Sequence, residues 1–122
     1  MMASVKVYYN PRCITCRRSM DRLKINKVEF ELHDFFKESL SKEEIKSLLK
    51  MAGLSARDLL RKKDKMYKEL KLEQKNYSED ELVVLMAKYP GLILRPIIVK
   101  RNKAVIANKP EIAETFCKRD LK

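Results

Sequence analysis

Two cysteines with two residues between them are the part of this sequence best suited to chemistry. Cys13 and Cys16 follow the segment Asn10-Pro11-Arg12. A spacing of three on a helix places both sulfurs on one face, within reach of a disulfide bond. Such a pair can alternate between the dithiol and the disulfide form. The first cysteine attacks the substrate as a thiolate and forms a mixed disulfide, and the second cysteine then attacks that mixed disulfide. The sequence therefore predicts thiol redox chemistry at this pair.

The expected surroundings favour Cys13 as the nucleophile. A free cysteine has a pKa of about 8.5 and is mostly protonated at neutral pH. Cys13 stands at the expected junction of a strand and a helix, where unpaired backbone N–H groups and the helix dipole stabilise an anion. Arg12, Arg17 and Arg18 add positive charge nearby. We therefore predict a thiolate of lowered pKa at Cys13, and in Cys16, one turn into the helix, the shielded thiol that resolves a mixed disulfide.

Other uses of the pair fit the sequence less well. A structural zinc ion needs two further ligands, and the remaining candidates, Cys117 and His33, stand on separate elements without a paired spacing. We therefore predict no metal site. Inert cysteine pairs normally lie in apolar surroundings rather than among arginines. A phosphatase-type loop requires a longer span between cysteine and arginine than the four residues that Cys13 and Arg18 enclose.

The composition is that of a globular domain with a basic excess. The 122 residues include 28 Lys and Arg against 17 Asp and Glu, a formal net charge of +11, and 45% are hydrophobic. No apolar run approaches the roughly 18 residues that cross a bilayer, and the N-terminus shows no signal-peptide pattern. We expect a cytoplasmic protein with reduced or catalytic thiols. The positive charge suits nucleic acid, an acidic partner, a small oxyanion or solubility. Direct nucleic-acid binding is the least favoured of these uses, because the sequence contains no recognised DNA-reading motif.

Hydrophobic patterning predicts the element order β-α-β, a block of helices, then β-β-α. A β-α-β unit favours parallel strands, whereas the turn at residues 101–103 favours an antiparallel hairpin. Met20, Leu23 and Ile25 are expected on the buried face of the first helix. The fold class is therefore α/β, with a thioredoxin-like mixed sheet and a helical subdomain inserted at about residues 41–90, in a single domain over residues 1–122. The predicted strands are 5–9, 28–33, 95–100 and 104–107, and the predicted helices are 14–26, 41–53, 55–61, 66–70, 78–89 and 110–116.

Four ordered motifs carry a resemblance over about residues 5–116. They are Asn10-Pro11-Arg12-Cys13, the segment 54–62 (Leu-Ser-Ala-Arg-Asp-Leu-Leu-Arg-Lys), Tyr89-Pro90 at a helix end, and the segment 95–99 (Arg-Pro-Ile-Ile-Val). Together they resemble the arsenate reductase family related to glutaredoxin (ArsC), which also contains the redox-sensing transcription regulators called Spx. The resemblance implies a thioredoxin-like fold with an inserted helical subdomain and a cis peptide bond at Arg95-Pro96.

The resemblance also implies roles for individual residues. Cys13 matches the cysteine that attacks arsenate, and Arg61 and Arg95 match two oxyanion-binding arginines. The third arginine falls at Lys109, which keeps the charge but lacks the guanidinium fork. The residues expected to support the site are Asn10, Arg12, Arg17 and Pro96.

Three positions depart from the reductases. Tyr9 stands where they usually have a histidine, Ile14 replaces a glycine, and Cys16 replaces a serine. Cys16 makes the site resemble Spx at that point, whereas Leu60-Arg61-Lys62 resembles the reductases.

We therefore expect an arsenate reductase-like thiol oxidoreductase with no bound cofactor, acting on a small oxyanion such as arsenate or on a disulfide. The family's usual reductants are glutathione and glutaredoxin, whereas a Cys13–Cys16 disulfide would suit thioredoxin or a similar protein. The alternative is an Spx-like redox-sensing regulator that binds RNA polymerase through a Cys13–Cys16 switch. No membrane partner is expected.

Overall fold

A computed structural model describes residues 5–107 and 109–118, and the chain divides into two compact units. The first unit comprises the chain up to Glu38 and from Arg95 onward, and the second comprises Ser39–Leu94. In the described ranges, none of the helices is both long enough and apolar enough to span a bilayer. That the whole chain acts as one domain stays a prediction.

The first unit contains a four-stranded mixed sheet in the order β2-β1-β3-β4. The strand β1 (Val5–Tyr9) pairs in parallel with β2 (Phe30–Asp34) and antiparallel with β3 (Ile97–Lys100), and β3 continues into β4 (Lys103–Ile106) as an antiparallel hairpin. The helix α1 (Ile14–Ile25) connects β1 to β2, and α6 (Pro110–Lys118) follows β4. This arrangement confirms the predicted α/β class and its element order.

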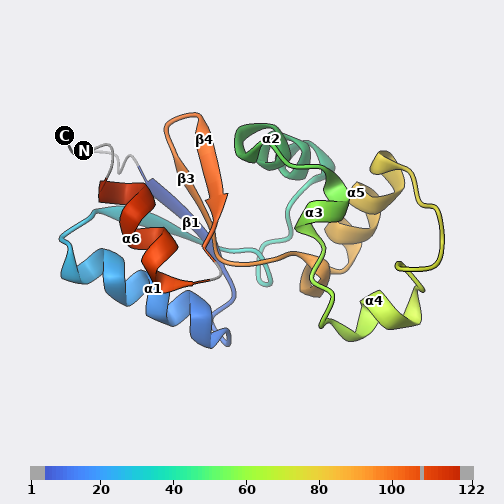
Figure 1. Cartoon of the computed structure of the whole chain (residues 1–122), viewed down its shortest axis with the longest axis horizontal. Coiled ribbons are helices and arrows are strands. Elements are labelled where there is room, and N and C mark those ends of the chain that lie inside the picture. The colour runs from blue at the N-terminus through green and yellow to red at the C-terminus, as the bar shows by residue number, and fades with distance from the viewer. Residues whose placement is uncertain (1–4, 108, 119–122) are drawn as a thin grey trace. The chain divides into compact units, whose positions relative to one another are not determined.

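The core of this unit lies between the sheet and the two helices, which pack side by side (Figure 1). Val5 and Val7 point to the same face because successive side chains of a strand alternate. The buried members of the core are Val5, Val7, Leu23, Ile98, Ala107, Ala113 and Cys117.

The first unit differs from the sequence-based expectation in α1 and in the starts of two strands, of which β3 begins at Ile97 rather than at Arg95. Ile25 is 74% exposed, whereas Leu23 is fully buried. Two residues that are two positions apart in a helix are separated by about 200° around its axis, so these side chains lie on opposite faces. The second strand begins at Phe30 rather than at Val28. Lys27 adopts a left-handed φ of 57°, and the Val28 N–H donates to the Leu23 carbonyl in the last turn of α1. Val28 therefore takes part in the hydrogen bonds that close the end of the helix, and it does not belong to the strand.

The second unit is helical, as the patterning predicts. Its elements are α2 (Lys42–Ala52), α3 (Ala56–Leu59), α4 (Lys65–Glu69), α5 (Glu79–Lys88) and the short 3₁₀ helix η1 (Pro90–Leu92). Capping boxes at Ser41 and Ser78 begin α2 and α5, and Gly53 ends α2 with a left-handed φ of 67°. The apolar faces of α2 and α5 are buried through Ile45, Leu48, Leu49, Leu82, Val83 and Met86.

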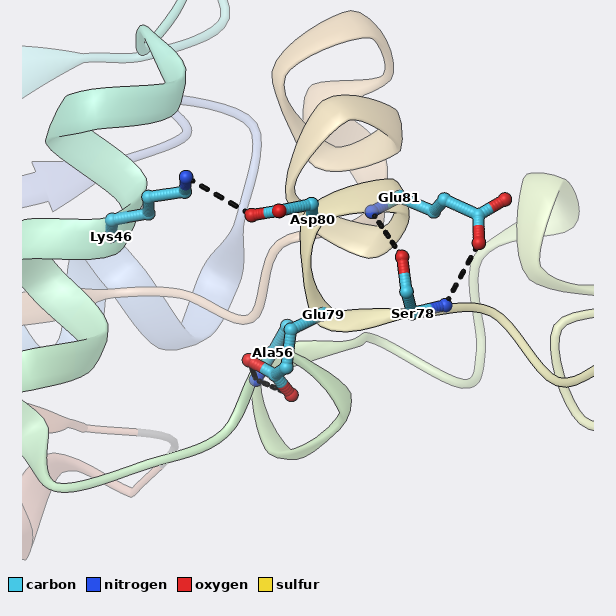
Figure 2. Close-up of polar contacts among 6 residues, drawn as sticks. All are labelled: Lys46, Ala56, Ser78, Glu79, Asp80 and Glu81. Carbon is cyan, nitrogen blue, oxygen red and sulfur yellow. Dashed lines mark hydrogen bonds and ion pairs between the residues drawn. The ribbon is translucent and has the colours of Figure 1, made fainter.

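The first turn of α5 holds three helices together (Figure 2). Ser78 and Glu81 form the capping box, with bonds of 3.1 and 3.0 Å. The Glu79 carboxylate accepts the Ala56 N–H at the start of α3, with its two oxygens at 3.1 and 3.0 Å. Asp80 pairs with Lys46 of α2 at 3.0 Å. Consecutive residues of one turn therefore link α5 to α3 and to α2.

Glu79→Ala is expected to lower the free energy of unfolding by about 1–2 kcal/mol, because a charge-assisted bond to a partly buried N–H is lost. Asp80→Ala is the matched control, since it breaks an exposed ion pair worth no more than about 1 kcal/mol. Urea unfolding measures both losses as a decrease in the urea concentration at the midpoint of the transition, with an unchanged dependence of the unfolding free energy on urea concentration. A Glu79→Ala loss no larger than that of Asp80→Ala would show that the bond to Ala56 does not stabilise the unit.

Candidate active site

The turn between β1 and α1 presents Cys13 at the end of the sheet. The Asn10 side-chain oxygen accepts the Arg12 N–H at 3.1 Å, and the Asn10 carbonyl accepts the Cys13 N–H at 3.0 Å. Arg17 reaches back along the helix, and its Nε donates to the Pro11 carbonyl at 3.0 Å. Asn10 and Arg17 thus fix the turn through hydrogen bonds within it.

Cys13 is the N-cap residue of α1. Its backbone is extended, with φ −85° and ψ 120°, and its Sγ accepts the Cys16 N–H at 3.4 Å. A serine or aspartate oxygen commonly occupies this place, where it satisfies one of the unpaired N–H groups of the first turn. In this chain a sulfur does so, at the positive end of the helix dipole.

Arg95 reaches the same place from the segment that precedes β3. The Arg95-Pro96 bond is cis, as the resemblance implies. The Pro96 carbonyl accepts the Ala107 N–H at 2.8 Å, and the Ala107 carbonyl accepts the hydroxyl of the fully buried Ser19 at 3.3 Å. This series of bonds fixes the Arg95-Pro96 segment relative to α1, and therefore relative to Cys13.

An aromatic ring lies against Arg95. The Cζ atom of Arg95 is 5.2 Å from the centroid of the Phe36 ring, within cation–π range. Phe36 stands in the turn after β2, where the Asp34 carboxylate accepts the N–H groups of Phe36 at 2.9 Å and Lys37 at 3.2 Å. His33 adds a bond from its ring to the Glu38 carbonyl at 3.1 Å.

These surroundings lower the pKa of Cys13 below that of an ordinary cysteine. Partial burial is the largest single influence, and it acts to raise the pKa. It is outweighed by the hydrogen bonds from Cys16 together with the charge and hydrogen bond of Arg95, all of which favour the thiolate. Cys13 is partly exposed, so a small electrophile can reach its sulfur.

Cys16 has the opposite character. It is fully buried, and burial raises its pKa to about 12, with a further raising contribution from the neighbouring Cys13. A hydrogen bond from the Asn10 backbone and the Arg95 charge oppose this rise. One helical turn therefore combines a thiol whose pKa is lowered with a thiol whose pKa is raised.

Arg61 belongs to the second unit and has contacts of its own there. Its N–H donates to the Leu92 carbonyl at 2.7 Å, and its Nη1 lies 3.8 Å from Asp64 Oδ1. Asp64 in turn packs against Gly91, where a Cβ atom would sit 2.5 Å from the same oxygen. A glycine at position 91 thus leaves room for the carboxylate that pairs with Arg61.

The remaining predicted cations lie on the surface of the first unit. Lys109 is exposed just before α6, where its carbonyl accepts the Ile112 N–H at 3.0 Å. Arg12 and Arg18 are also exposed. Within residues 5–107 and 109–118, no three His, Cys, Asp or Glu side chains gather as a metal-ligand set.

Sequence reasoning missed Phe36, Asp34 and Ser19. Asp34 offers a weak signal, because an aspartate after a strand is typical of a turn stabilised by its own side chain. Nothing in the sequence marks the contact of Phe36 with Arg95 or the bond of Ser19 to Ala107, since both join residues far apart in the chain.

The sequence profile of the ArsC family matches residues 8–116. The chain belongs to the ArsC family. The match covers both predicted catalytic cysteines and all three predicted oxyanion-binding residues.

Among curated proteins, the uncharacterized protein YfgD of Escherichia coli is 40% identical over 91% of this chain and 94% of its own length. An arsenate reductase of Neisseria meningitidis is 32% identical over 93% of this chain and 97% of its own length. The global transcriptional regulator Spx of Streptococcus pyogenes is 27% identical over 97% of this chain and 88% of its own length. This ArsC-family chain thus has relatives of both functional classes.

Among solved structures, an arsenate reductase from Vibrio cholerae is 34% identical and superposes with a TM-score of 0.87, covering 93% of this chain and 97% of that chain. The ArsC-type, thioredoxin-like fold expected from the sequence is therefore confirmed.

Proposed function

We propose that this ArsC-family chain is a thiol-dependent oxidoreductase of the arsenate reductase type, in which Cys13 attacks the substrate and Cys16 resolves the intermediate. One observation carries the proposal. The partly exposed Cys13 sulfur caps α1, where the Cys16 N–H and the Arg95 cation stabilise its anionic form, with a second thiol one turn away.

In the first step the Cys13 thiolate forms a sulfur–arsenic bond. An arsenic–oxygen bond breaks, and the oxygen leaves as water after taking up protons, so arsenic remains As(V). Arsenate is an anion, and the Arg95 guanidinium, which lies beside the sulfur, can bind it and stabilise the charge that builds during attack. We assign oxyanion-binding roles to Arg61 and Lys109 on the strength of the family motifs.

In the second step Cys16 loses its proton to solvent and attacks Cys13 Sγ. A sulfur–sulfur bond forms, the sulfur–arsenic bond breaks, and its electron pair stays on arsenic, which leaves as arsenite. Two sulfurs are oxidised while arsenic gains two electrons. Burial raises the pKa of Cys16 to about 12, and the negative charge of Cys13 contributes to the rise.

An external thiol reductant then returns the two electrons to the Cys13–Cys16 disulfide. We assign this role to a dithiol protein of the thioredoxin type, because the resolving thiol is already present in the chain and glutathione is not required for that step. Purified protein is expected to produce arsenite from arsenate with a thioredoxin system. No turnover with either a thioredoxin or a glutathione–glutaredoxin system would contradict the assignment of arsenate as substrate.

The second candidate is an Spx-like regulator, and the Cys13–Cys16 spacing favours it because the same pair can serve as a disulfide switch. RNA polymerase retained on the immobilised oxidised protein, but not on the reduced protein, would support the regulator. Arsenite formation without polymerase binding supports the reductase.

A further inference from the structure

Three chain segments meet at one end of the sheet because of its strand pairing. Strands β1 and β2 are parallel, with Tyr9 opposite Asp34, so the turns that follow them emerge side by side. Strand β3 is antiparallel to β1, with Ile97 opposite Tyr8, so the residues before Ile97 lie at the same end. The first turn carries Cys13, the second carries Phe36, and the third segment carries Arg95.

Phe36 lies at this end of the sheet and is not part of the buried hydrophobic core. Its side chain is 40% exposed, whereas the neighbouring Phe35, whose ring centroid is 5.1 Å away, is fully buried. An aromatic ring that is exposed to this extent contributes less hydrophobic stabilisation than a fully buried ring. The turn nevertheless holds the backbone of Phe36 firmly, through the Asp34 carboxylate and through bonds from the Lys37 and Glu38 N–H groups to the Asp34 carbonyl.

We propose that Phe36 is a positioning residue, whose ring holds the Arg95 guanidinium against the Cys13 sulfur. The inference deepens the proposed function, since it concerns the same nucleophile. A long arginine side chain has many rotamers, and placing its flat cation over a fixed ring favours the one that faces the sulfur. The ring also shields one side of the guanidinium from water, which strengthens its attraction to an anion. In this role Phe36 acts on the sulfur through Arg95.

The test is the pH profile of Cys13 alkylation by iodoacetamide, followed by mass spectrometry of the Cys13 peptide. Phe36→Leu is expected to raise the apparent pKa of Cys13 by about half a unit, a roughly threefold loss of thiolate below that pKa. Phe36→Tyr keeps an aromatic face and is expected to retain the wild-type profile. Leu32→Ala is the matched control, because Leu32 is another exposed apolar residue of the same strand–turn segment, 51% exposed.

A double mutant separates positioning from a general structural effect. In an Arg95→Gln background, where the cation is absent, Phe36→Leu is expected to cause no further change. An unchanged pKa in Phe36→Leu, or an equal shift with and without Arg95, would overturn the positioning role. The assay contains no arsenate, so a wild-type protein that fails to reduce arsenate would count against the proposed function alone.

Discussion

Cys13→Ser is expected to reduce arsenate-dependent formation of arsenite to background, a loss of at least about 10³-fold in turnover. A serine hydroxyl at the N-cap still accepts the N–H of residue 16, so the helix start is preserved. It remains protonated near neutral pH, however, and cannot form the sulfur–arsenic bond on which the first step depends. Arsenite production in a coupled thioredoxin assay measures the effect.

The matched control for this substitution is Cys117→Ala. Cys117 is buried in α6 and belongs to the core of the first unit, so the variant removes a sulfur but leaves the Cys13–Cys16 pair intact. It is expected to keep turnover at temperatures below its unfolding transition. Turnover that survives Cys13→Ser would show that another group attacks the substrate and would refute the mechanism.

Cys16→Ser is expected to abolish turnover supported by thioredoxin, by at least about 10²-fold, while leaving Cys13 reactive. The bond from the backbone N–H of residue 16 to Cys13 Sγ survives the change, and the serine hydroxyl can donate in place of the Cys16 thiol, whose bond also favours the Cys13 anion. The first step therefore proceeds, and the enzyme accumulates as a Cys13–arsenic adduct that no internal thiol releases. Rapid-quench mass spectrometry measures the adduct, and arsenite release measures turnover.

Glutathione provides the control for Cys16→Ser. An external thiol can attack the stalled adduct, so added glutathione with glutaredoxin is expected to restore part of the activity. Undiminished turnover of Cys16→Ser with thioredoxin alone would mean that the second sulfur has no part in the reaction.

Much of the fold could be predicted because its signals are local. The capping boxes at Ser41 and Ser78 and the left-handed Gly53 mark helix ends through bonds within a few residues, and the structure contains all three. The sequence-based predictions are wrong at positions whose conformation or burial depends on contacts beyond the local pattern. Ile25 is apolar but faces away from the sheet, and the left-handed turn at Lys27 uses Val28 to end the helix, so the second strand begins two residues later.

The candidate site could be predicted in part for the same reason. The Cys13–Cys16 spacing and the start of a helix are adjacent in the sequence, so the nucleophile could be named without a structure. Arg95 could be named only through the family motif, since nothing local ties it to Cys13. Phe36 could not be named at all, because its contact with Arg95 depends on the pairing of β2 and β3 with β1.

The pH dependence of the first step follows from the direction of the Cys13 shift. Because the pKa of Cys13 is lower in the folded protein than in the unfolded chain, the thiolate persists below the pH at which an unfolded cysteine becomes protonated. It is lost only as the pH falls through the folded pKa. Arg95→Gln removes the charge and hydrogen bond of Arg95 that favour the anion, and it is expected to move that pKa upward.

The alkylation rate of Cys13 as a function of pH, in native and in urea-unfolded protein, tests the central claim most directly. The native protein is expected to show an apparent pKa clearly below that of the unfolded chain, and to react faster at pH 7 after correction for accessibility. A native pKa equal to or above the unfolded value would mean that α1 and Arg95 do not stabilise the anion. The proposed nucleophile would then have no physical basis.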